Sequence, residues 1–215
     1  MIAHATDPRH HGPAGGLRHF TNAFSTLGLD FGTIAAILIG VEAGAGDTAD
    51  GIFRELAATG RSRLVLFFTR IPAALIVTLV VVASGLALAI LVTFLFAGGD
   101  PTPSAWLVVK SVGWVLLANS VVCTVAVGLG ALTGSRPAAL ISLIAWQTIA
   151  TRLLLDTTAL GGARKAVLDA ALTQLKPGPH GRGVTMSALL AAVVIALWAA
   201  IATTLGAWRT RNRDA

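Results

Sequence analysis

The residues of this sequence that could carry chemistry are concentrated in one charged stretch, residues 42–72. The stretch holds four acids and four arginines between long apolar runs: Glu42, Asp47, Asp50, Glu55, Arg54, Arg61, Arg63 and Arg70. Its Gly44-Ala45-Gly46-Asp47 sequence lacks the lysine of a phosphate-binding loop. The chain also has no HExxH or GxSxG motif and no pair of catalytic carboxylates. These patterns predict that the chain does not hydrolyse ATP itself and is not an enzyme.

A short amphipathic helix is expected within this stretch. The preceding apolar helix is predicted to end at three residues: Gly44, Gly46 and Asp47. Thr48 or Asp50 then supplies an N-cap oxygen, and Gly60 ends the short helix. Its apolar patch has three members: Ile52, Phe53 and Leu56. Arg54 and Glu55 face elsewhere, so a cytoplasmic motor protein could bind the helix through apolar anchors and charges.

Three polar side chains interrupt the apolar runs: Asp30, Asn119 and Gln147. Asp30 either lines a substrate path, pairs with a basic group, or lies hydrated near the outer membrane boundary. Asn119 and Gln147 are expected to form hydrogen bonds between helices, worth about 0.6–2 kcal/mol each. Arg152 and Asp156 stand four residues apart, which predicts an ion pair on one helix.

The composition is that of a membrane protein. The 215 residues are 55% hydrophobic and 12% charged, with a mean hydropathy of +0.78, whereas soluble domains carry about 25% charged residues. The net charge of +6 comes from arginines at the edges of apolar runs, which favours lipid headgroups over nucleic acid as the partner. Cys123 is the only cysteine, so no intrachain disulfide forms. The histidines near the N-terminus lack the spacing of a metal site.

The apolar runs predict an all-α fold, a polytopic transmembrane helical bundle. Five spans are expected, at about 24–41, 64–97, 106–132, 137–155 and 184–208. Residues 1–23 are predicted to form a polar extracytoplasmic tail, 24–208 the membrane domain, and 209–215 a basic cytoplasmic tail. Close helix contacts are expected at four glycines: Gly85, Gly113, Gly128 and Gly130.

The long link 156–183 is predicted to hold an amphipathic helix on the outer membrane surface. Apolar residues recur there at helical spacing: Leu160, Ala163, Val167, Ala171 and Leu175. The segment ends at the Lys176-Pro177-Gly178-Pro179 sequence. Arginines gather around 42–63 and at the C-terminus, so the positive-inside rule puts both in the cytoplasm and the N-terminus outside.

The charged stretch resembles the cytoplasmic loop of ABC-2-type exporter permeases. The residues that carry the resemblance are Glu42, Gly51-Ile52-Phe53-Arg54-Glu55-Leu56-Ala57-Ala58-Thr59-Gly60-Arg61-Ser62-Arg63 and Arg70-Ile71-Pro72. In that family an acidic residue and a glycine precede a short coupling helix, which leads through a turn of small residues and arginine into the next span. The resemblance implies that the loop 42–63 couples to an ATPase through Glu42, Gly51, Ile52, Phe53, Arg54, Glu55, Leu56, Gly60, Arg61 and Arg63.

The resemblance also implies partners and a location. The chain would dimerise, alone or with a similar permease subunit, in the lipid of a bacterial plasma membrane, which it crosses several times. Two ABC ATP-binding subunits would bind on the cytoplasmic side and hold ATP and Mg²⁺, so this chain needs no cofactor. The segment 156–183 would correspond to the external re-entrant or interfacial helices between the family's last two spans.

The span count departs from the family pattern. Members have six spans with a cytoplasmic N-terminus, and their coupling loop follows the second span, whereas here it follows the first of five. The expectation is a permease that lacks its first transmembrane helix. The alternative function is a non-transporting membrane accessory or assembly protein derived from a truncated permease. A membrane-embedded enzyme would need acids, histidines or serines at a common depth. Drugs, lipids, glycans and peptides all fit as substrates.

Overall fold

The computed structural model describes residues 15–50, 62–98, 100–178 and 184–212. Within these ranges the chain is helical and contains no strand, which confirms the all-α fold class. Five helical stretches are long and apolar enough to cross a membrane: Gly16–Asp47, Arg63–Leu95, Ala105–Thr133, Arg136–Asp156 and Ala188–Arg211. The protein is therefore a polytopic helical membrane protein.

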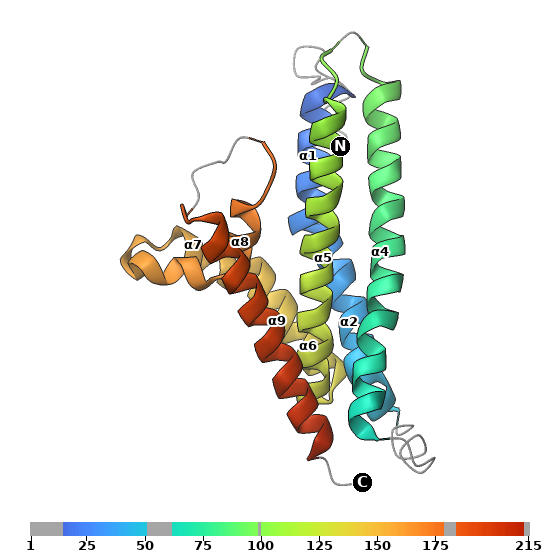
Figure 1. Cartoon of the computed structure of the whole chain (residues 1–215), viewed down its shortest axis with the longest axis vertical. Coiled ribbons are helices and arrows are strands. Elements are labelled where there is room, and N and C mark those ends of the chain that lie inside the picture. The colour runs from blue at the N-terminus through green and yellow to red at the C-terminus, as the bar shows by residue number, and fades with distance from the viewer. Residues whose placement is uncertain (1–14, 51–61, 99, 179–183, 213–215) are drawn as a thin grey trace.

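Figure 1 shows how the helical elements are arranged. In chain order they are α1 (Gly16–Leu29), α2 (Phe31–Ala49), α4 (Arg63–Leu95), α5 (Ala105–Thr133), α6 (Arg136–Ala145), the π-helical turn η2 (Trp146–Ala150), α7 (Thr151–Asp156), the 3₁₀ segment η3 (Thr158–Ala166), α8 (Leu168–Gln174) and α9 (Ala188–Arg211). The later four spans begin and end close to the residues predicted from the apolar runs.

Helix α5 is the centre of the bundle, and α2, α4 and α9 all pack against it (Figure 1). Its sequence is apolar on every side, which suits a helix that is surrounded by others. The Ser104 hydroxyl caps its first turn by accepting from the Leu107 N–H at 3.3 Å. Gly134 ends it in the left-handed conformation, with φ at 66° and its N–H bonded to the Gly130 carbonyl.

Close packing in the bundle depends on glycine, as the sequence predicts, but at partly different positions. A Cβ added at Gly128 would overlap the Ala202 carbonyl of α9, and one added at Gly130 would lie 3.2 Å from the Val41 carbonyl of α2. Gly113 is wrong as a contact position, because nothing lies within 4 Å of its added Cβ. Small residues at such crossings let two backbones approach closely.

The first span is longer than the apolar run 24–41. Its helix already begins at Gly16, because Phe20 and Phe24 are buried against α4 and α5. The predicted stop near Gly44 is wrong, since α2 continues to Ala49. Gly44 instead faces α5, where an added Cβ would overlap the Val127 carbonyl. Here glycine permits helix packing rather than ending the helix.

The link 156–183 does not form one surface helix, so that prediction is wrong. Gly161 adopts φ 47° and ψ −123°, and Val167 is extended, so the segment divides into η3 and α8. Two tryptophan indoles from the spans hold it. Trp114 donates to the Leu172 carbonyl at 2.8 Å, and Trp198 donates to the Ala166 carbonyl at 2.9 Å. Burial of the α8 side chains therefore fixes this segment against the bundle.

Candidate functional site

Five charged residues form two sets of ion pairs on α2, α4 and α6. The end of α2 and the beginnings of α4 and α6 lie at the end of the bundle where α9 ends (Figure 1). We call the five residues the basal cluster: Glu42, Asp47 and Asp50 of α2 and its end, Arg70 of α4, and Arg136 of α6. The acids extend from the last part of the first span, and the arginines come from the start of the second and fourth spans. The cluster therefore connects three membrane helices by ion pairs.

Arg136 bridges two acids of α2. Its Nη1 and Nη2 donate to the two carboxylate oxygens of Asp50 at 3.0 and 2.7 Å, and Nη2 also donates to Glu42 Oε1 at 2.7 Å. Glu42 and Asp50 are eight residues apart, so both lie on the same helix face with Gly46 between them. A Cβ at Gly46 would lie 2.9 Å from Glu42 Oε1 and 3.2 Å from Arg136 Nη2. The glycine leaves room for the guanidinium.

Arg70 forms the second connection and is more buried. Its Nη2 donates to Asp47 Oδ2 at 2.6 Å, and its Nη1 lies 3.5 Å from the Gly44 carbonyl. The Arg70 side chain is 11% exposed, whereas Asp47 is 40% exposed. A buried guanidinium needs such partners, because its transfer from water is costly without them. The Arg70–Asp47 ion pair thus links α4 to the last part of α2.

In the sequence, residues of the basal cluster precede and follow the predicted coupling helix. Most of the residues predicted to contact an ATPase lie outside the described residues: Gly51, Ile52, Phe53, Arg54, Glu55, Leu56, Gly60 and Arg61. Of the other two, Glu42 belongs to the basal cluster and Arg63 is the first residue of α4. The Ser62 hydroxyl caps α4 there by accepting from the Val65 N–H at 3.2 Å.

The three predicted intramembrane polar residues converge on one break in the first span. The helix is interrupted at Asp30, between α1 and α2, which leaves carbonyls of the last α1 turn without helical donors. Asn119 of α5 donates to the Leu27 carbonyl at 3.0 Å, and Gln147 of η2 lies 3.4 Å from the Leu29 carbonyl. The break is thus stabilised by side chains far away in the sequence.

Arg152 and Asp169 complete this group. We call the five residues the Asp30 junction: Asp30, Asn119, Gln147, Arg152 and Asp169. Arg152 Nη2 lies 3.7 Å from Asp30 Oδ1, so it pairs across the bundle and not with Asp156 as predicted. Gln147 Nε2 donates to both carboxylate oxygens of Asp169 at 3.0 Å. Asp30 therefore follows the predicted alternative in which it pairs with a basic group.

Sequence reasoning missed Asp169. It lies in α8, and burial raises the pKa of its carboxyl to about 6, although the hydrogen bond from Gln147 acts in the opposite direction. A signal was present, since Asp169 is the one acid in the apolar sequence Ala166–Leu172. The amphipathic interpretation of residues 156–183 did not consider this acid, and the packing of α8 places it at the junction.

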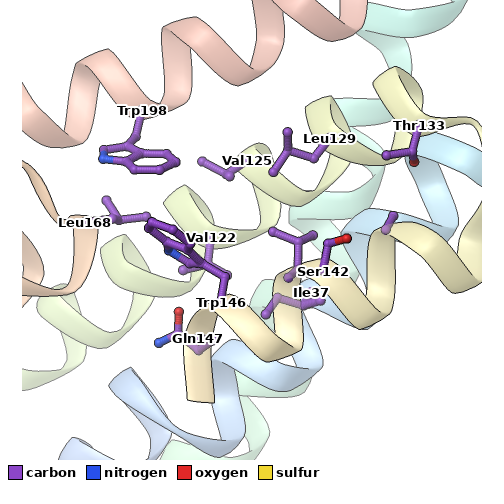
Figure 2. A pocket seen from close by; sticks show the side chains of 12 residues that line it. Ile37, Val122, Val125, Leu129, Thr133, Ser142, Trp146, Gln147, Leu168 and Trp198 are labelled. Atoms are coloured by element: carbon purple, nitrogen blue, oxygen red, sulfur yellow. The ribbon is translucent and has the colours of Figure 1, made fainter. Parts of the chain in front are cut away.

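An apolar cavity lies on the other side of Gln147 (Figure 2). It has a volume of about 240 Å³ and is lined by side chains of α5, α6 and α9. The rings of Trp146 and Trp198 are 5.8 Å apart at one end of it. With one amide and two hydroxyls in its lining, this cavity suits an apolar group such as a lipid chain.

Comparison with protein-family models, curated proteins and solved structures finds no match for this chain. Its function must therefore be argued from the two polar groups, the basal cluster and the Asp30 junction. Within the described residues, no group of three histidines, cysteines or acids could hold a metal ion. The residues of these two groups form ion pairs and hydrogen bonds between helices, and such contacts can change when helices move relative to one another.

Proposed function

We propose that this chain is the membrane-spanning permease subunit of an ABC-type exporter of the ABC-2 class. It would form the translocation path in a bacterial plasma membrane, as a homodimer or with a similar subunit. A separate ATPase would bind ATP and Mg²⁺ and act on the loop 42–63. The observation that carries the proposal is the basal cluster, because ion pairs from the first residues of the segment 42–63 link α2 to α4 and to α6.

The cluster supplies a way to transmit movement. A push on the loop would act on the ends of α2 and α4, which the Arg70–Asp47 pair holds together, and Arg136 would carry it to α6. The break at Asp30 would serve as the hinge, since the helical hydrogen bonding is already interrupted there. The α2 helix could then tilt while α1 stays packed on α4 and α5.

The test is ATPase stimulation after co-expression of this chain with a candidate ABC ATP-binding subunit. We expect Phe53→Asp with Leu56→Asp to abolish complex formation, because both residues would be apolar anchors of the coupling helix. Arg136→Ala should still form the complex but lower permease-stimulated ATPase activity by roughly fivefold or more. Its melting temperature should change little, because ion pairs of half-exposed side chains contribute little to stability.

Arg209→Ala is the matched control for Arg136→Ala. Arg209 is exposed in the last turn of α9, so the variant removes the same charge at the same end of the bundle. Its ATPase activity should equal that of the unmodified chain. An equal loss of stimulated ATPase activity in both arginine variants would show a general effect of charge and would contradict coupling through the basal cluster. Failure of the unmodified chain to bind an ATPase would exclude the exporter and leave the accessory protein.

A further inference from the structure

A second cavity, of about 650 Å³, lies beside the Asp30 junction. It is an open cleft between the α1–α2 break, the π-helical turn, α7 and α8, with the exposed side chains of Asp30 and Arg152 at its mouth. Five hydroxyl side chains contribute to its lining. Its volume falls within the range of about 300–1,000 Å³ that is typical of small-molecule sites. A bare metal ion or a single water would fill only a small part of it. The cavity is therefore of the size that an organic molecule occupies.

The charges in the cavity favour a positively charged ligand. Two carboxylates line it, from Asp30 and Asp169, against one guanidinium, from Arg152. Arg152 is directed to Asp30 at 3.7 Å. Among the described residues, Asp169 has a neutral hydrogen-bond donor, the Gln147 amide, and no basic side chain in an ion pair. The charges of Arg152 and Asp30 both act on the Asp169 carboxyl, so the lining as a whole has one carboxylate more than it has guanidinium groups. That excess of negative charge attracts a cation from outside the chain.

Thr151 gives an independent indication of a ligand. It lines the cavity and is 2% exposed, yet its hydroxyl has no hydrogen-bond partner. Thr148, in the same wall, instead donates to the Ile144 carbonyl at 2.7 Å. Leaving a buried hydroxyl unpaired costs about 1–3 kcal/mol. The Thr151 oxygen is closed off from the cavity in its present rotamer, so it would reach a ligand there by rotation about the Cα–Cβ bond. The Thr151 oxygen can accept a hydrogen bond from an ammonium N–H.

We propose that this cavity binds the ammonium group of an organic amine, with Asp169 as its counter-ion and the Thr151 hydroxyl as a hydrogen-bond acceptor. The apolar part of the amine would contact Leu29, Ile34 and Leu155 in the same lining. The further statement that amines are the exported substrate class rests on the proposed exporter function. Amine binding itself is a property of the cavity and can be measured without transport.

The probe is phenethylamine, titrated into the purified full chain in nanodiscs and followed by calorimetry. 2-Phenylethanol and 3-phenylpropanoate have a similar apolar body and serve as the neutral and anionic comparisons. We expect saturable binding of the amine and no measurable binding of the anion. Asp169→Asn should weaken amine binding by roughly tenfold or more, since a charge-assisted hydrogen bond is lost. Thr151→Val should weaken it by a smaller factor.

Asp156→Asn is the matched control, because Asp156 ends α7 outside the cavity lining. Amine affinity should also fall between about pH 7 and about pH 5, because the Asp169 carboxyl becomes protonated while the amine stays charged. Asp30 and Arg152 are the other charged groups that act on Asp169. An Asp30→Asn variant therefore distinguishes the contribution of the Asp30 carboxyl from that of Asp169. The pH dependence of amine affinity should persist in Asp30→Asn and vanish in Asp169→Asn.

Equal binding of amine and alcohol, or equal amine affinity in Asp169→Asn and Asp156→Asn, would overturn the inference. If Asp169→Asn does not fold, the amine–alcohol comparison and the pH dependence of the unmodified chain decide. The two proposals fail separately. If the chain binds an ATPase but does not bind amines, the exporter proposal stands and amines are excluded as its substrates. Amine binding without any ATPase complex leaves a binding site in a membrane protein that is not an exporter.

Discussion

Asn119 shows how one polar side chain can organise an apolar bundle. It is fully buried, and its amide N–H groups donate to the Leu27 carbonyl of α1 at 3.0 Å and to the Val115 carbonyl of its own helix at 2.8 Å. The bond to Leu27 satisfies a carbonyl that the break at Asp30 leaves without a helical donor. The residue therefore stabilises both the bend in the first span and its position on α5.

We expect Asn119→Ala to lower the free energy of unfolding by about 1–3 kcal/mol, because the Leu27 carbonyl loses its donor. Ser120→Ala is the control, since the Ser120 hydroxyl bonds only within its own helix, to the Leu116 carbonyl at 2.7 Å. Ser120→Ala should change the free energy of unfolding by no more than about 0.5 kcal/mol. Thermal unfolding in detergent measures both. Equal losses would show that the bond across the helix break contributes nothing.

At the scale of residues, the sequence identifies which side chains are unusual but not which of them meet. Asp30, Asn119 and Gln147 are recognisable because polar groups are rare inside spans. The partners of Glu42 and Asp50 could not be predicted, since Arg136 is 94 and 86 residues away from them. Helical periodicity relates positions a few residues apart and contains no information about such long-range pairs.

The crossings between helices depend on which face a glycine occupies. Gly128 and Gly113 lie in the same helix, yet an added Cβ would overlap the Ala202 carbonyl at Gly128 and meet nothing within 4 Å at Gly113. The sequence cannot distinguish them, because α5 is apolar all round and has no hydrophobic face to orient it. For the same reason it could not show that Gly44 packs on α5 instead of ending α2.

We expect Gly128→Ala to destabilise the bundle by about 1–3 kcal/mol, since α5 and α9 must separate to admit the methyl group. Gly113→Ala is the matched variant. It should be neutral or stabilise the protein by up to about 1 kcal/mol through its higher helix propensity. Melting temperatures of the two purified variants give the comparison. A loss of stability at Gly113 as large as that at Gly128 would contradict the packing described for α5.

At the scale of the whole molecule, run length and composition predicted the number of spans and the fold class, because bilayer thickness sets the length of an apolar helix. They did not predict how the spans assemble. The beginning of the first span was missed because His19 and Arg18 make its first turns polar. Burial of Phe20 and Phe24 against the bundle outweighs that polarity.

Orientation in the membrane can be tested with introduced cysteines, because Cys123 is fully buried and should not react. Ser62 and Thr102 are exposed at opposite ends of α4 and the following loop. If residues 42–63 face the cytoplasm, a membrane-impermeant maleimide should label Thr102→Cys in intact cells and Ser62→Cys in inverted vesicles. The reverse pattern would place the coupling loop outside and contradict the exporter proposal.

The break at Asp30 also bears on how the protein is made. The α1 helix has 14 residues and is therefore about 21 Å long, shorter than the hydrocarbon core of about 30 Å. It cannot cross the bilayer alone, whereas α2, with 19 residues, is close to sufficient. The Leu29 carbonyl at the end of α1 already accepts from the nearby Thr33 hydroxyl at 3.0 Å, whereas the Leu27 carbonyl accepts from Asn119, which is synthesised much later. The bend in the first span therefore reaches its final hydrogen bonding only when α5 packs against it.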